Sequence, residues 1–273
     1  MRAIPNFDTC RRLKLRPILG MLLIGLMSPA PAQARWQPRP TTAPWQWQLT
    51  GKVDLDVRAR VFDIDGLRAK ASTVRALHRR GRRAVCYIAV GTHEPFRADA
   101  GRFPPQVLGR RLSDFPDERW LDIRRIELLA PVLRARLDTC ARKGFDGVEP
   151  DNVDGYANRT GFPLTAADQL RFNRWVAREA RARDLAVGLK NDTAQMKALV
   201  RDFDFAVVEQ CFEFRECGRY SPFVKAGKPV FVAEYRVKPE RFCARARRLR
   251  FSAIHKRLEL GRFRRTCAAP RSH

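Results

Sequence analysis

Short apolar runs alternate with longer amphipathic stretches along most of the chain, and this alternation is the first indication of the fold. The runs predict eight strands, which cover residues 45–49, 60–64, 83–90, 146–151, 186–190, 205–209, 230–234 and 251–255. Amphipathic stretches between several of them, such as 72–80 and 126–143, carry apolar residues at helical spacing. Strands that alternate with helices are typical of a parallel sheet covered by helices. Eight such strands predict an α/β protein with a single (β/α)8 TIM barrel domain.

Local signals support the ends of the predicted helices and leave one alternative fold open. Gly81 and Gly144 follow predicted helices, where glycine commonly ends a helix in the left-handed conformation. Thr165 and Asp168 form a capping box at the start of another helix. The alternative fold is an open doubly wound sheet, which usually carries a glycine-rich phosphate-binding turn after its first strand. The sequence shows no such turn, so the barrel is favoured.

The first 34 residues have the pattern of a secretory signal peptide. Basic residues precede an apolar run over 18–27, and Ala32-Gln33-Ala34 provides a small-x-small cleavage pattern. The run is shorter than the about 20 residues that a membrane-spanning helix needs, and an uncleaved N-terminal anchor is the alternative. We expect cleavage near Ala34, no membrane span afterwards, and a secreted or periplasmic protein. The predicted parts are a signal peptide over 1–34, an extended lead-in over 35–44, the barrel over 45–260 and a C-terminal tail over 261–273.

Seven cysteines bear on the compartment and on possible metal sites. Cys10 lies in the predicted signal peptide, and the six that remain permit disulfides in an exported chain. Short spacing and position favour two disulfides, Cys211 with Cys217 and Cys243 with Cys267. Cys86 and Cys140 are expected to be buried thiols, one on a strand and one on a helix. Spacing typical of zinc ligands is missing from the sequence, so no metal site is predicted.

The net charge of +25 arises from arginine, since only ten of the 54 basic residues are lysines. Basic runs at 79–83 and 245–250 carry enough charge to bind phosphates. Aromatic residues for base stacking are not interleaved with these runs, so a solvated basic face is favoured over specific nucleic-acid recognition. Electrostatic association with an anionic cell surface stays open as a partner prediction.

Polar residues gather where the predicted strands end, which is where barrel enzymes place their catalytic groups. Because side chains alternate along a strand, Glu149 and Asp151 share one face of theirs. We therefore expect these strand ends to form one site. The candidates are Asp63, Tyr87, Glu149, Asp151, Asn152, Asp154, Lys190, Asn191, Asp192, Glu209, Glu234 and Tyr235.

Two carboxyl groups that face each other across a cleft are the requirement for glycoside hydrolysis. Asp151 and Glu209 stand at the predicted rim, which favours a functional role for both. Glu149 is equally consistent with a structural ion pair to Lys190 inside the barrel. Trp47 and several tyrosines near strand ends are candidate platforms for stacking a sugar.

Four stretches of the chain resemble glycoside hydrolase family 114. They are Trp-Gln-Trp-Gln-Leu at 45–49, the run 146–156, Gly-Leu-Lys-Asn-Asp at 188–192 and Glu-Gln-Cys-Phe at 209–212. The resemblance implies a (β/α)8 barrel with endo-α-1,4-polygalactosaminidase activity and without a metal or organic cofactor. By motif position, it makes Asp151 the nucleophile and Glu209 the acid/base. Other motif positions are matched by Asp146, Glu149, Asp154, Lys190 and Asp192.

The basic charge leaves the substrate and even the enzymatic role open at this point. De-N-acetylated galactosamine polymers are cationic, and a basic protein repels them at long range unless an acidic cleft offsets this. Otherwise an N-acetylated, neutral or anionic polysaccharide is the substrate. A non-catalytic carbohydrate- or cell-surface-binding barrel is the alternative function. A metal-dependent hydrolase would require clustered histidines, and the four in the chain are scattered.

Overall fold

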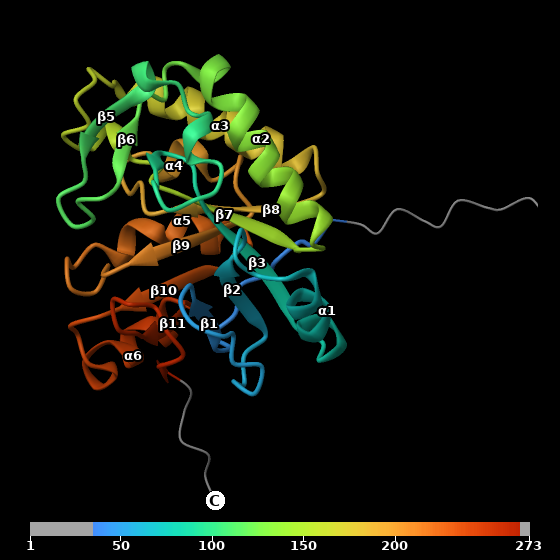
Figure 1. Ribbon diagram of the computed structural model, residues 1–273. Coiled ribbons are helices and arrows are strands. Elements are labelled where there is room, and N and C mark those ends of the chain that lie inside the picture. The colour runs from blue at the N-terminus through green and yellow to red at the C-terminus, as the bar shows by residue number, and fades with distance from the viewer. Residues whose placement is uncertain (1–34, 268–273) are drawn as a thin grey trace, which may run out of the picture. The chain divides into compact units, whose positions relative to one another are not determined.

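The computed structural model describes residues 35–267, which form a curled sheet with helices on its outer side (Figure 1). The predicted signal peptide lies outside the described residues. Within them, eight parallel strands follow one another in chain order. They are β1 (Trp45–Gln48), β2 (Val61–Asp65), β3 (Arg83–Ala89), β7 (Gly147–Asp151), β8 (Ala186–Lys190), β9 (Phe205–Glu209), β10 (Val230–Glu234) and β11 (Ser252–His255). The predicted (β/α)8 barrel is confirmed.

The two ends of the parallel sheet meet at a seam between β1 and β11. The carbonyl of Leu260, beyond β11, accepts the backbone N–H groups of Leu49 and Thr50 at 2.9 and 3.3 Å. The Ser252 hydroxyl of β11 donates to the carbonyl of Ala43 at 2.5 Å, just before β1. These contacts join the first and last strands of the barrel.

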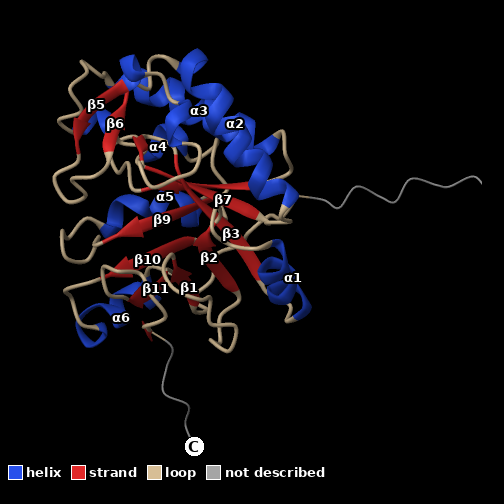
Figure 2. Cartoon of the chain, viewed as in Figure 1, coloured by secondary structure: helices blue, strands red, loops and turns tan. Residues whose placement is uncertain are grey.

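In the described part of the chain, helices cover the outer face of the sheet (Figure 2). They are α1 (Ala71–Arg79), α2 (Ile126–Arg142), α3 (Ala166–Arg181), α4 (Met196–Leu199), α5 (Ser221–Lys225) and α6 (Pro239–Arg248). The capping box at the start of α3 is present, since the Thr165 hydroxyl accepts the N–H of Asp168 at 3.1 Å and the Asp168 carboxylate accepts the N–H of Thr165 at 3.0 Å. Gly81 and Gly144 follow their helices at φ 67° and 83°, as the left-handed end of a helix requires.

A small antiparallel sheet that the periodicity did not predict lies between β3 and α2. It consists of β4 (Thr92–His93), β5 (Leu108–Arg111) and β6 (Arg119–Leu121), in the order β4-β6-β5. These strands are short and rich in arginine, so they lack the apolar run or alternation that marks a strand in sequence. The chain also forms β12 (Arg265–Thr266), which pairs antiparallel with β11. Short 3-10 turns occur at Ala100–Arg102, Pro105–Val107, Gly155–Ala157 and Cys217–Tyr220.

The apolar core is divided by the sheet into an outer and an inner part. The outer part packs the helices against outward-facing strand residues such as Ile64 and Val148. The inner part fills the barrel with Trp45, Trp47 and eight other buried side chains. Gly188 makes room there, because a Cβ at this position would lie 2.3 Å from the ring of Phe205. The apolar filling of the barrel ends where the polar strand ends begin.

Three disulfides cross-link the barrel. Cys211–Cys217 and Cys243–Cys267 are the two pairs favoured from the sequence. The expectation that Cys86 and Cys140 are free thiols was wrong, because they form the third disulfide. Cys86 lies on the outward face of β3 and Cys140 on the buried face of α2, so the packing of this helix brings them together.

Candidate active site

Lys190, at the end of β8, is the centre of the site. Its ammonium nitrogen lies 2.9 Å from Asp151, 3.1 Å from Glu209 and 3.2 Å from Glu149. The ring of Trp47 lies beneath it, with the ring centroid 4.8 Å from the nitrogen. Burial by itself lowers the pKa of Lys190, but the three carboxylates outweigh this effect and hold the pKa well above its ordinary value. Lys190 is therefore a fixed positive charge that draws three acidic groups together.

The chain makes the same kind of turn after each strand that carries these carboxylates and the lysine. Asn152 after β7, Asn191 after β8 and Gln210 after β9 have φ values of 62°, 46° and 56°. Only a few residue types tolerate this left-handed conformation, and asparagine is the most frequent after glycine. Residues in such strained backbone conformations cluster at functional sites, and here three of them lie at the ends of neighbouring strands. Each turn ends a strand immediately after its last inward-facing side chain.

Asp151, the last residue of β7, is held as a carboxylate. Its two oxygens accept hydrogen bonds from Lys190 at 2.9 Å and from the Tyr87 hydroxyl at 2.8 Å, and the N–H of Asn152 adds a third at 2.8 Å. Burial raises the pKa of Asp151, yet the Lys190 charge and these hydrogen bonds outweigh it and keep the pKa below its ordinary value. An ionised carboxylate at neutral pH is the state that a nucleophile needs.

Glu209, the last residue of β9, faces Asp151 across Lys190. The Tyr235 hydroxyl donates to one of its oxygens, and the Asn191 amide donates to the other at 3.4 Å. The side chain is 25% exposed, so solvent reaches it. Because both carboxylates contact one ammonium nitrogen, the bonded oxygens of Asp151 and Glu209 are at most about 6 Å apart. This upper limit for one oxygen of each group is compatible with the about 5–5.5 Å between the carboxyl groups of retaining glycosidases.

Asp63 and Glu149 lie deeper in the barrel, where neither is exposed by more than 1%. Burial raises the pKa of Glu149 to about 7, although Lys190 opposes the shift. Burial and the proximity of Glu149 hold the pKa of Asp63 well above its ordinary value. Burial is thus the main cause of both raised pKa values. The ion pair of Glu149 with Lys190 is present, so this residue supports the site from below.

A second acidic pair, Asp154 and Asp192, lies beside the Lys190 cluster. Asp192 accepts hydrogen bonds from Asn173 of α3 at 3.0 Å and from the Tyr156 hydroxyl at 3.3 Å. Burial and the charge of Asp154 raise the pKa of Asp192 to about 7. Burial and the charge of Asp151 raise the pKa of Asp154 to about 6. Both carboxyl groups therefore have pKa values raised toward neutral pH.

Two residues of the predicted set are placed differently from the rest. Trp47 is only 1% exposed, so its ring supports Lys190 from inside the barrel and offers no surface for a sugar. Glu234 points to the outer side of the sheet, because its neighbour Ala233 is the residue that lies in register with Glu209. There it accepts the N–H of Phe212 at 2.7 Å and holds the loop after β9.

Glu118, which sequence reasoning missed, joins the site from the small sheet. The Thr92 hydroxyl lies 3.0 Å from the Glu118 carboxylate and 3.0 Å from the side-chain oxygen of Asn152. Burial and the charge of Glu94 raise the pKa of Glu118 to about 7. Its position could not be inferred, because it precedes a strand that the periodicity does not reveal.

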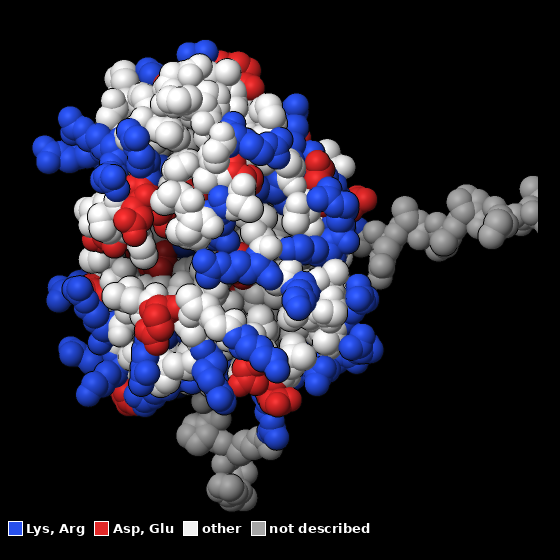
Figure 3. All heavy atoms as spheres, in the orientation of Figure 1, with Lys and Arg blue, Asp and Glu red and all other residues white. Residues whose placement is uncertain are grey.

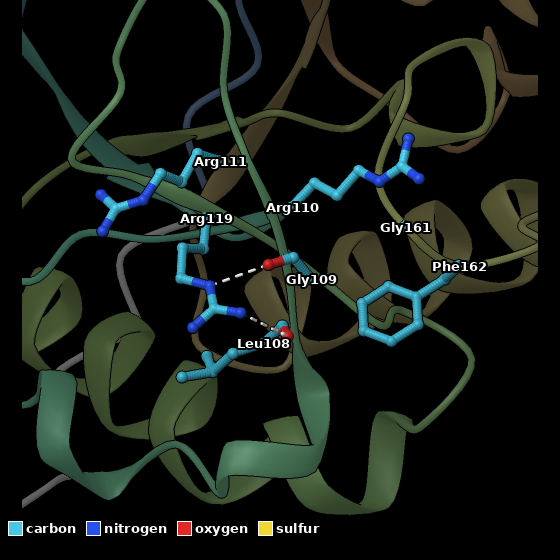
Figure 4. Close-up of a pocket in the computed structure, with 7 residues that line it drawn as sticks. All are labelled: Leu108, Gly109, Arg110, Arg111, Arg119, Gly161 and Phe162. Atoms are coloured by element: carbon cyan, nitrogen blue, oxygen red, sulfur yellow. Dashed lines mark hydrogen bonds between the residues drawn. The ribbon is translucent and has the colours of Figure 1, made fainter.

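A separate cavity of about 630 Å³ lies on the outer side of the small sheet (Figure 4). It is lined by Arg110, Arg111 and Arg119 together with Phe162 and neighbouring backbone. Arg119 donates to the carbonyls of Gly109 and Leu108 at 2.8 and 3.1 Å, while Arg110 and Arg111 extend in opposite directions. The lining contains no carboxylate, so this cavity cannot replace the Lys190 cluster as a catalytic site.

Within residues 35–267, the group with metal-ligand spacing is Cys211, Cys217 and Glu234, and the disulfide between the cysteines removes their thiolates as ligands. Among these same residues, no helix is both long and apolar enough to cross a bilayer.

Comparison with known proteins identifies the family to which this geometry belongs. The sequence profile of glycoside hydrolase family GH114 matches residues 26–271. The chain belongs to this family. A crystal structure of Ega3 from Aspergillus fumigatus, determined in complex with galactosamine, is 35% identical, with a TM-score of 0.81. The match covers 86% of this chain and 99% of that one, and the protein is accordingly a glycosidase with a carbohydrate substrate.

Two further proteins share less of their sequence with the chain. The glycoside hydrolase domain of PelA from Pseudomonas aeruginosa is 14% identical with a TM-score of 0.64, covering 82% of this chain and 98% of that domain. This likeness shows a common fold. An uncharacterised protein of Deinococcus radiodurans is 27% identical over 217 residues, which are 71% of this chain and 68% of that protein.

Proposed function

We propose that this glycosidase is an exported, endo-acting enzyme that cleaves galactosamine-containing polysaccharides with retention, in the manner of an endo-α-1,4-polygalactosaminidase. The observation that carries the proposal is the contact of Asp151 and Glu209 with one ammonium group, that of Lys190, which places one oxygen of each within about 6 Å of the other. Galactosamine as the sugar is supported by the complex of the 35% identical Ega3.

The first chemical step forms a glycosyl-enzyme ester. The Asp151 carboxylate attacks the anomeric carbon while the bond to the leaving oxygen breaks, and Glu209 gives its proton to that oxygen. Asp151 is suited to this role because its pKa lies below the ordinary value. Hydrogen bonds from Tyr87 and Lys190 fix the direction of its two oxygens. The Asn191 amide and the Tyr235 hydroxyl fix Glu209 in the same way.

The second step releases the sugar. Glu209, now a carboxylate, takes a proton from water, and the water oxygen attacks the anomeric carbon. The bond to Asp151 breaks, and the electron pair returns to its carboxylate. Lys190 stabilises the charge that reappears there, because its ammonium lies 2.9 Å from one oxygen of this carboxylate.

Export is supported by the signal-peptide pattern of residues 1–34 and by the disulfides of the barrel, which are typical of oxidising compartments. Exposed arginines such as Arg79, Arg80 and Arg247 support association with an anionic cell surface after export.

The test is an assay of the purified mature domain on polymers of galactosamine, galactose and glucosamine, with sizing of the products. The proposal expects mid-chain cleavage of the galactosamine polymer and products of several sugars. Binding to the panel without cleavage of any member contradicts it and favours the non-catalytic binding barrel.

A further inference from the structure

Large apolar side chains that are exposed gather at one end of the barrel. Among residues 35–267, the four that are more than half exposed are Phe96, Phe115, Phe214 and Leu258. Each lies in a segment that follows the carboxyl end of a strand, which is the end that carries Lys190 and its carboxylates. Exposed aromatic rings around a catalytic site commonly contact ligand, whereas single exposed apolar residues need no special explanation. The surroundings of the four residues distinguish those that could contact a sugar.

Two of the phenylalanines share a local pattern with acidic residues. Phe115 lies in Asp114-Phe115-Pro116-Asp117 and Phe214 in Glu213-Phe214-Arg215-Glu216, so each has carboxylates one residue before and two residues after it. Phe115 is 59% exposed and Phe214 is 62% exposed. Asp114 and Asp117 are exposed and have no ion-pair partner in the described part of the chain. In the Phe214 loop, Glu213 has a contact of 3.5 Å to Arg236, whose side chain is 78% exposed. An open aromatic face beside carboxylates suits a ligand that is both a sugar and a cation.

The other two exposed residues lack this pattern and serve as references. Guanidinium groups of Arg68 and Arg97 lie 5.4 and 5.1 Å from the ring centroid of Phe96, so cations of the protein already occupy its surroundings. Leu258 has no aromatic face. Neither is suited to hold a positively charged sugar.

The Phe115 turn is tied to the Asp151 side of the catalytic pair. Phe115 sits at the tip between β5 and β6, where its carbonyl accepts the N–H of Glu118 at 2.9 Å. Glu118 in turn lies 3.0 Å from the hydroxyl of Thr92, and that hydroxyl lies 3.0 Å from Asn152. Asn152 directly follows Asp151.

The Phe214 loop is tied to the Glu209 side. The disulfide Cys211–Cys217 closes the loop, and the N–H of Phe214 donates to the carbonyl of Gln210 at 3.0 Å. The Gln210 amide also donates to Glu213 at 2.9 Å, and Gln210 directly follows Glu209. In Figure 3, acidic residues gather around a hollow on the side where Figure 1 shows the loop between β5 and β6 and the loop after β9.

We infer that these two loops are outer binding sites for protonated amino-sugar units of the polysaccharide, one on each side of the Asp151–Glu209 pair. At each site the C–H face of a sugar stacks on phenylalanine, and its 2-ammonium group pairs with the neighbouring carboxylates. This inference rests on the proposed function and makes its substrate the de-N-acetylated, cationic form of the polymer. It also explains how a protein of charge +25 holds a cationic chain, since the local carboxylates offset the long-range repulsion.

The test separates binding at the outer sites from chemistry at the centre. Phe115→Ala, Phe214→Ala and the double variant D114N/D117N are compared with wild type on a galactosamine polymer that is largely de-N-acetylated, on its re-acetylated form, and on an aryl galactosaminide that is too short to reach the outer sites. Phe96→Ala and Leu258→Ala are the matched controls, because they remove exposed apolar groups of similar size at the same end of the barrel.

We expect KM for the de-N-acetylated polymer to rise about tenfold in each test variant, as loss of one stacking or charge contact in a subsite predicts. Turnover of the aryl substrate should stay at the wild-type level, which also shows that the variants are folded. The controls should leave all three activities unchanged. The D114N/D117N effect should shrink in high salt, whereas the Phe115→Ala effect should persist.

Two different failures are distinguishable. If wild type cleaves no galactosamine polymer, the proposed function is wrong. If wild type cleaves the polymer but the test variants keep its KM, or D114N/D117N loses affinity equally for the acetylated form, the outer sites as inferred here do not exist.

Discussion

The ammonium group of Lys190 lies 2.9 Å from the carboxylate of Asp151 and thereby keeps a partly buried acid ionised. Replacing the lysine by methionine removes this charge while retaining most of the side-chain volume. We expect the pKa of Asp151 to rise, because burial then acts without the opposing cation. The acidic limb of the pH profile of kcat/KM should move to higher pH, with kcat reduced at least about 100-fold. An unshifted profile in a folded Lys190→Met protein would contradict the role of this lysine.

The same substitution bears on stability. Removing one partner of a buried ion pair typically costs about 3–5 kcal/mol, because the remaining charge is left uncompensated. A lowered melting temperature is therefore expected, and the pH profile must be measured well below it.

Tyr87 provides a milder test of the same site. Tyr87→Phe removes one hydrogen bond to Asp151 and leaves the lysine in place. The pKa of Asp151 should rise only slightly, so the acidic limb should shift by less than in Lys190→Met, and kcat should fall about tenfold. Tyr156→Phe is the control, since Tyr156 donates to Asp192 and not to Asp151. Equal effects of the two tyrosine variants on the acidic limb would argue against the assignment.

Glu149 predicts how stability depends on pH. Its pKa is raised to about 7 by burial, so the folded protein holds a proton there that the unfolded chain releases near its ordinary pKa of about 4.3. The stabilisation that comes from this proton is complete at pH 4 and is lost as the pH rises through about 7. Glu149→Gln keeps a neutral group at every pH. The melting temperature of the variant minus that of wild type should therefore be larger at pH 8 than at pH 5. An equal difference at both pH values would refute this role of the Glu149 proton.

The disulfides should separate stability from activity. In the loop-entropy picture, Cys86–Cys140, with a sequence separation of 54, contributes about 4 kcal/mol, and Cys211–Cys217, with a separation of 6, about 2 kcal/mol. The double serine variant of the first pair should lose more stability in denaturant.

The variant of the second pair should lose more activity on polymer, because its loop carries Phe214 and directly follows Glu209 and Gln210. The reverse order of the two activity losses would contradict this account of the loop.

Much of this molecule could be predicted from local patterns. The bounds of β8, β9 and β10 agree with the predicted strands to the residue, because buried parallel strands are continuous apolar runs with polar ends. The gathering of Asp151, Lys190 and Glu209 followed from the rule that barrel strand ends meet at one face. These predictions needed only periodicity and the direction of the strands.

The remaining features depended on contacts between distant segments. Cys86 and Cys140 are 54 residues apart, and only the docking of α2 on β3 shows that they meet. Glu118 directly precedes β6, in a sheet whose strands have two to four residues and are too short to leave a period. Glu234 follows a strand as regularly as Glu209 does, and only the register between β9 and β10 shows that it points outward.

The central claim is that Asp151 forms a covalent bond with the sugar while Glu209 transfers the proton. The most direct measurement is mass spectrometry of the enzyme after reaction with a 5-fluoro-galactosaminyl fluoride, which forms the ester quickly and releases it slowly. The account predicts one added glycosyl group, located by peptide mapping on Asp151, and its accumulation in Glu209→Gln with this activated substrate as well. A label on another carboxylate, or turnover of the polymer with inversion at the anomeric carbon and no label, would contradict it.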